Sequence, residues 1–156
     1  MDAKYQKFFL GANSCKGFES HFSDCYAARD GWCAYIIKGG PGTGKSSFMK
    51  RCADVAERRG AETEYYYCSS DPTSLDGILI SDKGSRIGIL DGTEPHVFEP
   101  KCPGEVDEII NLGRFWNSEL LHEQKNEILS LSNKKSTAYK RAYDYLRSCG
   151  NLRAVT

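Results

Sequence analysis

The feature that most constrains the fold is a glycine-rich stretch between an apolar run and an amphipathic segment. It matches the pattern G-x-x-x-x-G-K-[ST], whose four fixed positions are filled by Gly39, Gly44, Lys45 and Ser46. The pattern predicts a loop that binds the phosphate groups of a nucleotide. The loop would consist of Gly39, Gly40, Pro41, Gly42, Thr43, Gly44, Lys45, Ser46 and Ser47.

The residue types of this stretch suit a polyphosphate ligand. A triphosphate requires several backbone N–H groups that converge on it, and side chains with a Cβ would block that approach. A helix that begins at the loop adds free N–H groups and the positive end of its dipole. We expect Lys45 to contact the β- and γ-phosphates and the Ser46 hydroxyl to bind Mg²⁺. The predicted cofactors are ATP or GTP, together with Mg²⁺.

The residues on both sides of the loop fit this interpretation. Cys33–Ile37 is a short apolar run typical of a buried strand. Apolar residues at helical spacing after the loop predict a helix over residues 46–59, which Gly60 would end. Together they predict an α/β protein like the P-loop NTPases, with an open, mostly parallel sheet and flanking helices.

Asp71 follows a second predicted strand, residues 63–68. Ligands of open α/β sheets collect at the carboxyl ends of parallel strands. Asp71 is therefore a candidate for binding Mg²⁺, a water molecule or a substrate hydroxyl. The alternative is that an aspartate before Pro72 is only a turn residue.

Two short apolar segments, 77–80 and 86–90, predict a hairpin with a glycine-containing turn. Asp91 stands directly at the end of the second segment. This is the arrangement of a Walker B element, whose carboxylate reaches the Mg²⁺ shell. Asp82 competes for the role, but it lies in what should be an exposed turn. The predicted metal ligands are Ser46, Asp91 and Asp71.

Glu94 and His96 follow Asp91 in a loop that would bring either of them within reach of a γ-phosphate. Each is a candidate for positioning the attacking water, although a histidine beside a proline is more often a loop residue. Arg86 and Arg114 are candidates for an arginine finger on charge alone. The predicted catalytic residues are Lys45, Asp91 and Glu94.

The flanking segments are predicted from their apolar patterns. Residues 1–32 should form an outer strand near 5–10 and a helix over 18–26, with a cap at Asn13 or Ser14. Residues 33–113 would be the nucleotide-binding core of a single domain that spans residues 1–156. A loop at 100–104 should be followed by a short helix over 105–112.

Residues 114–150 are predicted to form a helical arm, with Asn117 capping a long helix that runs to about residue 148. A heptad seam is formed by Leu121, Ile128, Leu131, Ala138, Ala142, Tyr145 and Cys149, with Gln124 and Lys135 as interruptions. A break at Ser132-Asn133 would convert the helix into a helical hairpin. The length of the helix over 117–149 favours contact with a protein partner or with another helix of the same chain.

The number of predicted strands and the composition limit the remaining expectations about the sheet, the partners and the location. Three or four parallel strands plus an edge hairpin can be placed, whereas such a sheet usually has about five, so we expect it to be completed by residues outside this chain. The chain has 21 basic and 21 acidic residues, which does not indicate a nucleic acid or membrane partner. It has neither a long apolar run nor a secretion signal, so a cytoplasmic location is expected. The seven cysteines contain no C-x-x-C pair and are expected to be free thiols.

Several strings together resemble an uncharacterised family of bacterial P-loop ATPases. The most distinctive are Cys68-Ser69-Ser70-Asp71 and Leu90-Asp91-Gly92-Thr93 with Pro95-His96, beside the loop itself. The resemblance extends to about residue 149 and implies nucleotide binding at Gly39–Ser47. It also implies two related P-loop halves in tandem, of which this chain is similar to the first.

Three functions are compatible with these residues. The first is Mg²⁺-dependent hydrolysis of a nucleoside triphosphate, coupled to an unknown partner. The second is a small-molecule or nucleotide kinase, because Asp91-Gly92 followed by Pro95 is similar to a string of nucleotide kinases. The third is a nucleotide-sensing module that binds without hydrolysis. The sequence lacks an Asn-Lys-x-Asp string after the loop, which favours ATP over GTP.

Overall fold

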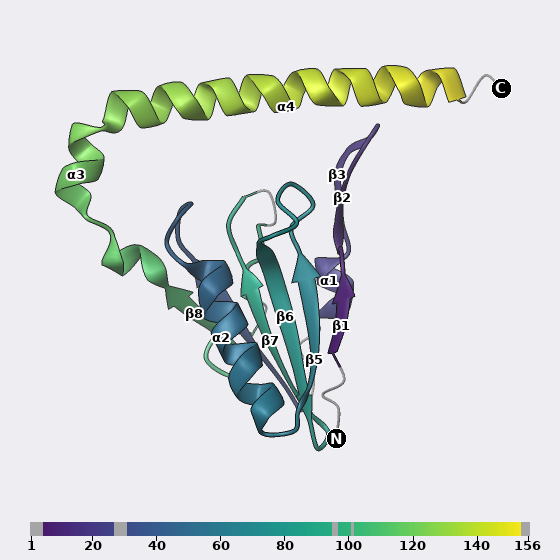
Figure 1. Ribbon diagram of the computed structural model, residues 1–156, viewed down its shortest axis with the longest axis vertical. Helices are drawn as coiled ribbons and strands as arrows, with labels where there is room; N and C mark the ends of the chain where they lie inside the picture. The colour runs from purple at the N-terminus through teal and green to yellow at the C-terminus, as the bar shows by residue number, and fades with distance from the viewer. Residues whose placement is uncertain (1–4, 27–30, 95–96, 101, 154–156) are drawn as a thin grey trace. The chain divides into compact units, whose positions relative to one another are not determined.

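A computed structural model describes residues 5–26, 31–94, 97–100 and 102–153 (Figure 1). The chain divides into two compact units. One consists of Met1–Gly11 and Ser20–Phe115 and contains a six-stranded sheet. The other consists of Ala12–Glu19 and Trp116–Thr156 and contains a long helix.

The sheet has the strand order β1-β5-β6-β7-β4-β8. Five strands run in the same direction, and β6 alone is antiparallel to its neighbours. The sheet is therefore mostly parallel, as the sequence predicts. The strands are β1 (Tyr5–Phe8), β4 (Trp32–Lys38), β5 (Glu62–Tyr67), β6 (Leu75–Asp82), β7 (Ser85–Asp91) and β8 (Asp107–Asn111).

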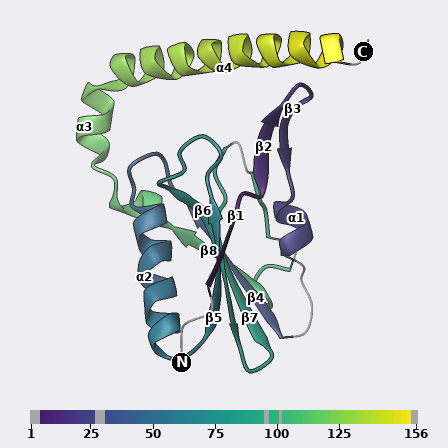
Figure 2. The same cartoon turned by 45° about the vertical axis from the view of Figure 1, so that its right-hand side comes forward.

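Both faces of the sheet are covered by helix, as Figure 2 shows. On one face, α2 (Lys45–Arg58) packs Met49 and Ala53 against Ile78 and Ile89. On the other, α1 (Phe22–Cys25) belongs to a second apolar cluster that includes Leu79 and Leu90. Because neighbouring residues of a strand point to opposite faces, these central strands are apolar on both sides.

Tyr26 holds the second cluster against the sheet. Its ring lies so close to Gly88 that a Cβ at that glycine would be 2.3 Å from the ring. Its hydroxyl donates a hydrogen bond of 3.1 Å to the carbonyl of Ile78. Burial raises the pKa of Tyr26 well above its usual value, with the neighbouring Tyr66 adding to the shift. Gly88 is thus required for close packing of an aromatic ring.

The helix predicted over 18–26 is mostly wrong. Gly11–Ser14 and Gly17–Ser20 form the antiparallel ribbon β2–β3, and only Phe22–Cys25 is helical. The Ser14 hydroxyl accepts a hydrogen bond from the amide of Lys16, and Gly17 has a φ of +109°. Serine and glycine here make a tight turn, so neither Asn13 nor Ser14 caps a helix.

The short helix predicted over 105–112 is also wrong, because Asp107–Asn111 is the edge strand β8. It pairs in parallel with β4, and Ile36 lies opposite Ile109. The Asp107 carboxylate accepts the amide of Cys102 at 2.9 Å, which closes a turn before the strand. With β8, the described sheet has five strands of one direction.

The second unit contains α3 (Ser118–Glu123) and α4 (Lys125–Arg153), preceded in the chain by a 3-10 turn at Leu112–Phe115. Asn117 caps α3, since its side chain accepts the amide of Leu120 at 3.1 Å. The predicted long helix is confirmed, but its break lies at Gln124 and not at Ser132-Asn133. In the part of the chain that the structure describes, no helix has the length and apolar character needed to span a membrane. None of the seven cysteines is part of a disulfide in the described structure.

Candidate functional site

The loop Gly39–Gly44 joins the end of β4 to the start of α2, at the edge where the parallel strands end. β7 lies beside β4, and their register places Ile37 opposite Asp91. The sequence predicts this order of strand, glycine loop and helix, and the structure confirms it. The loop and Asp91 are thereby brought to the same edge of the sheet.

Glycine is needed at several positions of the loop. Gly42 and Gly44 have φ values of +76° and +86°, a region that residues with a Cβ rarely adopt. The Thr43 hydroxyl donates to the carbonyl of Gly40 at 2.8 Å. A Cβ on Gly39 would lie 2.8 Å from that hydroxyl oxygen. The loop is therefore tightly curled, with the Thr43 side chain closing it from inside.

The start of α2 supplies backbone donors to this edge. Its first helical hydrogen bond runs from the amide of Phe48 to the carbonyl of Gly44 at 2.9 Å. The amides of Lys45, Ser46 and Ser47 precede that bond, and the cap residue Gly44 makes no side-chain cap bond. These three N–H groups and the helix dipole make the edge attractive to an anion.

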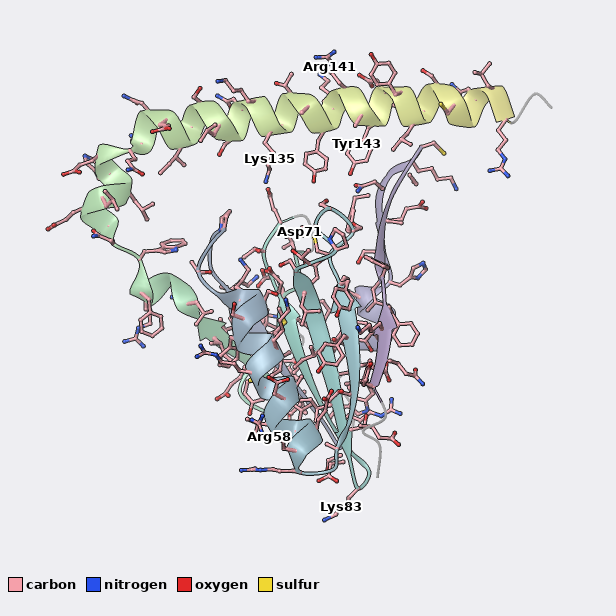
Figure 3. The ribbon with its side chains drawn as sticks, in the orientation of Figure 1. Arg58, Asp71, Lys83, Lys135, Arg141 and Tyr143 are labelled. Carbon is pink, nitrogen blue, oxygen red and sulfur yellow. The ribbon has the colours of Figure 1, made fainter. Side chains whose placement is uncertain are left out.

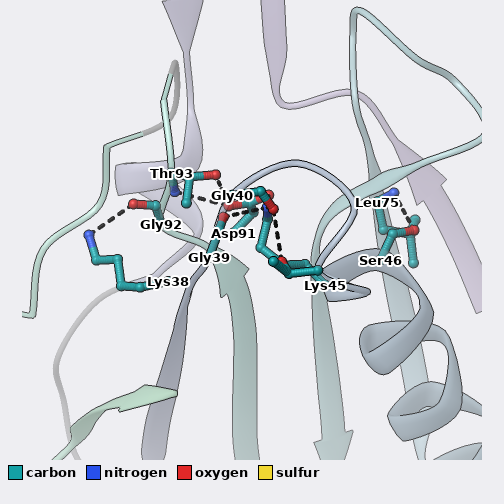
Figure 4. A network of polar contacts seen from close by, with 10 residues as sticks. Lys38, Gly39, Gly40, Lys45, Ser46, Leu75, Asp91, Gly92 and Thr93 are labelled. Atoms are coloured by element: carbon teal, nitrogen blue, oxygen red, sulfur yellow. Dashed lines mark hydrogen bonds and ion pairs between the residues drawn. The ribbon is translucent and has the colours of Figure 1, made fainter. Parts of the chain in front are cut away.

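Lys45 is held inside the loop (Figure 4). Its Nζ donates to the carbonyls of Gly39 at 2.7 Å and Gly40 at 3.0 Å. It also lies 3.5 Å from Oδ2 of Asp91, and both side chains are nearly buried. The ammonium thus occupies the centre of the curl, where it is neutralised by Asp91.

Asp91 is fixed by the residue two positions after it. Its Oδ1 accepts hydrogen bonds from the amide of Thr93 at 2.9 Å and from the Thr93 hydroxyl at 2.5 Å. Because Oδ1 is held in this way, Oδ2 is directed toward Lys45. Of the three aspartates weighed from the sequence, Asp91 is the one that the structure brings to the loop lysine.

Ser46 makes a contact that the sequence does not indicate. Its Oγ accepts the amide of Leu75, the first residue of β6, at 3.0 Å. Ser46 and Asp91 share no hydrogen bond in the described structure. The Ser46 hydroxyl keeps a lone pair and its proton for another partner. Ser46 and Asp91 both supply oxygen atoms, the kind of ligand that Mg²⁺ prefers.

Asp71 lies in the loop between β5 and β6 and is exposed. Its Oδ1 accepts the amide of Thr73 at 3.0 Å and the Thr73 hydroxyl at 2.7 Å. These hydrogen bonds lower the pKa of the Asp71 carboxyl. The turn interpretation therefore describes Asp71, which forms no hydrogen bond or ion pair with Lys45 or Asp91 in the described structure.

The remaining candidates are Glu94, His96 and Asp82. Glu94 is exposed in the segment after Asp91, and His96 is among the residues that the structure does not describe. Asp82 ends β6 and pairs with Ser85 at the start of β7, which is the opposite end of that strand from Asp91. Figure 3 shows Asp71 and Lys83 at opposite ends of the sheet.

The arginine candidates are no better placed. Arg86 stacks over the ring of Trp32 at 5.1 Å, near the start of β4 and β7. Arg114 is exposed in the 3-10 turn after β8. In the described structure neither arginine forms a hydrogen bond or ion pair with the loop Gly39–Gly44.

Asp76 is a residue of this edge that the sequence analysis did not single out. It is 6% exposed. The register pairs Gly77 with Leu90, so Asp76 and Asp91 come one residue further along at the ends of β6 and β7. The repeated string Leu-Asp-Gly at 75–77 and 90–92 was the available signal. Because β6 and β7 pair in antiparallel, the start of β6 and the end of β7 meet, and the two aspartates of the repeat come to the same edge of the sheet.

Asp76 also affects a neighbouring thiol. Burial raises the pKa of Cys68, and the charge and hydrogen bond of Asp76 add to the shift. The amides of Ser70 and Asp71 act in the opposite direction. Cys68 is thus held as a protonated thiol, which disfavours a nucleophilic role for it.

Lys38, the last residue of β4, fixes the segment that follows Asp91. Its Nζ donates to the carbonyls of Gly92 at 2.9 Å and Phe98 at 3.1 Å, and to Glu99 at 2.6 Å. A Cβ on Gly92 would lie 2.5 Å from the side chain of Ile36. The segment after Asp91 is therefore anchored directly across the end of β4, beside the loop.

We compared the chain with protein-family models and with solved structures. No protein-family model matches the chain. No solved structure matches it either.

Proposed function

We propose that this chain binds a nucleoside triphosphate at Gly39–Ser47, most simply ATP with Mg²⁺, and hydrolyses it. The observation that carries the proposal is the position of Lys45, between the loop carbonyls and Asp91. The nearly buried ammonium of Lys45 could exchange the carbonyls of Gly39 and Gly40 for phosphate oxygens when a nucleotide binds. The resemblance to tandem P-loop ATPases supports the same reading.

The loop has the features that a phosphate group needs. A side chain at Gly39 would clash with Thr43, so the loop has no space for a Cβ at this position. The first amides of α2 point out of the helix start, where they would donate to the β- and γ-phosphate oxygens. Lys45 would neutralise part of the charge that develops on the γ-phosphate.

The residues present also fit Mg²⁺. Ser46 and Asp91 would hold it, directly or through water, as oxygen ligands. Asp71 remains a further candidate only if its loop moves from the turn described above. Mg²⁺ would supply charge neutralisation between the β- and γ-phosphates. Asp91 has a second role in this chain, because it fixes Lys45 through Oδ2 while Thr93 holds Oδ1.

Hydrolysis requires a water positioned in line with the γ-phosphate. We propose Glu94 for this role, because it lies three residues beyond Asp91 in the segment that Lys38 anchors. Its exposed carboxylate would need to turn toward the loop to accept a proton from that water.

The proposal is tested by calorimetric titration of ATP and GTP, with and without Mg²⁺. We expect micromolar-range binding of ATP by the wild type and a loss of about tenfold or more in Lys45→Ala, because an ionic hydrogen bond is worth about 1.5–3 kcal/mol. Lys83→Ala is the matched control, since Lys83 lies at the other end of the sheet. Equal binding by wild type and Lys45→Ala would refute the proposal.

Product analysis separates hydrolysis from the two alternatives. Release of inorganic phosphate with no added acceptor supports hydrolysis. Phosphorylation of an added nucleoside or nucleotide would indicate a kinase instead. Tight binding with no phosphate release would leave only the sensing role.

A further inference from the structure

α4 carries an apolar seam that is exposed to solvent. Its members follow one another in steps of three, four or seven residues: Ile128, Leu131, Ala138, Ala142, Tyr145, Cys149 and Leu152. Four of the larger ones, Ile128, Leu131, Tyr145 and Leu152, are 38%, 56%, 68% and 73% exposed. An apolar stripe of this regularity is normally buried against another helix.

The hairpin β2–β3, which belongs to the same unit, packs on a different face of α4. The Tyr143 hydroxyl donates to Oδ1 of Asn13 at 2.7 Å. A Cβ on Gly150 would lie 2.8 Å from the Cβ of Cys15. Tyr143 and Gly150 are two turns apart on one face, roughly 90° around the helix from the seam at 100° per residue. The hairpin therefore leaves the seam open.

The surface along the seam is basic. Lys134 and Arg141 flank it on one side, and Lys135 lies within it. Figure 3 shows Arg141 and Tyr143 projecting from opposite sides of α4, so the basic flank and the hairpin do not compete. Residues 134–153 contain one acidic residue, Asp144, which pairs with Arg147 at 3.1 Å. The basic residues of this stretch are Lys134, Lys135, Lys140, Arg141, Arg147 and Arg153.

This charge pattern decides between possible occupants. A second copy of α4 would bring two basic surfaces together, which is unfavourable across a helix pair. A nucleic acid would satisfy the charges, but it would leave Leu131 and the rest of the seam in water. Only a helix with its own apolar stripe and acidic flanks satisfies both features.

We propose that α4 docks an acidic amphipathic helix of a partner protein. Apolar residues of the partner pack on the seam, and its carboxylates pair with Lys134, Lys135 and Arg141. This surface is independent of the nucleotide site, so its test does not depend on nucleotide binding.

The probe is a designed helical peptide of about four heptads, with leucine in its seam and glutamate on both flanks. A second peptide has lysine on the flanks. Fluorescence anisotropy with the full chain should show binding of the glutamate peptide only, weakening as salt rises. Ile128→Gln with Leu131→Gln should weaken binding about tenfold or more, as should Lys134→Glu with Arg141→Glu.

Lys140→Glu is the matched control. Lys140 is adjacent to Arg141 in the sequence but lies roughly 160° around the helix from the seam. We expect this variant to bind the glutamate peptide like the wild type, apart from a small change in long-range attraction. Circular dichroism of every variant checks that α4 stays helical, which exposed substitutions should allow.

Five outcomes would overturn the proposal. Three concern the peptides: no binding of the glutamate peptide, equal binding of the lysine peptide, or a loss of binding in Lys140→Glu equal to that in the variant with Lys134→Glu and Arg141→Glu. The fourth is a nucleic acid duplex that binds with no effect of Ile128→Gln and Leu131→Gln. The fifth is a dimer of the chain that Leu131→Gln dissociates, which would assign the seam to a second copy.

Discussion

Replacement of Gly39 by alanine tests whether the loop is curled as tightly as the structure shows. The added Cβ would lie 2.8 Å from Oγ1 of Thr43 and 3.3 Å from the Cβ of Leu112. Gly39 is not among the glycines with positive φ, so alanine adds a steric conflict and no backbone strain. The Thr43 hydroxyl would have to rotate away from the carbonyl of Gly40, which it now contacts at 2.8 Å.

The magnitude follows from these two contacts. Loss of a hydrogen bond costs about 0.5–1.5 kcal/mol, and an off-rotamer side chain costs about the same again. Gly39→Ala should therefore lower the free energy of unfolding by about 1–3 kcal/mol. In a Thr43→Ala background the closest clash and the hydrogen bond are both absent. The same glycine substitution should then cost about 1 kcal/mol less, which is the coupling energy of the pair.

Urea unfolding followed by tryptophan fluorescence measures these differences, because Trp32 lies in β4, a strand of the sheet that unfolding disrupts. The four proteins required are the wild type, the two single variants and the double variant. Strict additivity would refute the reasoning, because it would mean that the alanine methyl does not meet Thr43. A Gly39→Ala protein as stable as the wild type would refute the curl itself.

Three further predictions concern other contacts. Asp91→Asn should weaken the Mg²⁺ dependence of ATP binding more than the affinity for metal-free ATP, measured by calorimetry with and without EDTA, because it removes a negative oxygen ligand and frees Lys45. Gly88→Ala should lower the unfolding free energy by about 3 kcal/mol or more in urea, because its Cβ would lie 2.3 Å from the Tyr26 ring. Tyr26→Phe should reduce the loss of stability above pH 10, measured by urea unfolding at a series of pH values. The pKa of Tyr26 is raised in the folded state. Its contribution to stability is therefore full below the unfolded-state pKa of about 10 and is lost as the pH rises from there through the raised folded-state pKa.

The order of strand, glycine loop and helix could be predicted from sequence because its requirements are local. Gly42 and Gly44 permit positive φ. The residues from Lys45 onward have apolar side chains at the spacing of an amphipathic helix. No distant residue is needed to specify this strand, loop and helix. The placement of Asp91 was also accessible, since a strand that ends in an acid and lies beside β4 must deliver it to the same edge.

The strands β3 and β8 could not be predicted because distant contacts decide them. Phe18, Phe22, Cys25 and Tyr26 have helical spacing, but a turn at Lys16 directs Phe18 into a hairpin. Asp107–Asn111 begins after several acids, which resembles the first turn of a helix. Hydrogen bonds to the open edge of β4 outweigh that local preference, as tertiary pairing commonly does.

The hairpin predicted from segments 77–80 and 86–90 is confirmed, but its first strand begins at Leu75, two residues earlier than predicted. The sequence therefore missed Asp76 and the partner of Ser46. A parallel strand after β5 would begin at the far end of the sheet. Because β6 is reversed, it begins at the edge where β4 and β7 end, and Leu75 can donate its amide to Ser46. The loop before it is held against α2, since Nζ of Lys50 donates to the carbonyl of Thr73 at 2.8 Å.

This arrangement links the 69–75 loop directly to the proposed metal ligand. If Ser46 turns toward Mg²⁺ when nucleotide binds, its bond to Leu75 must lengthen or adjust, and the loop containing Asp71 must respond. Ser46→Ala removes the bond without adding bulk. Hydrogen exchange of the amides in residues 69–75 should then rise in the nucleotide-free variant. In the wild type, addition of Mg²⁺ and ATP should change exchange in the same residues, whereas the turn at Lys83 and Gly84 should be unaffected. Unchanged exchange at 69–75 in both experiments would show that this loop is not coupled to Ser46.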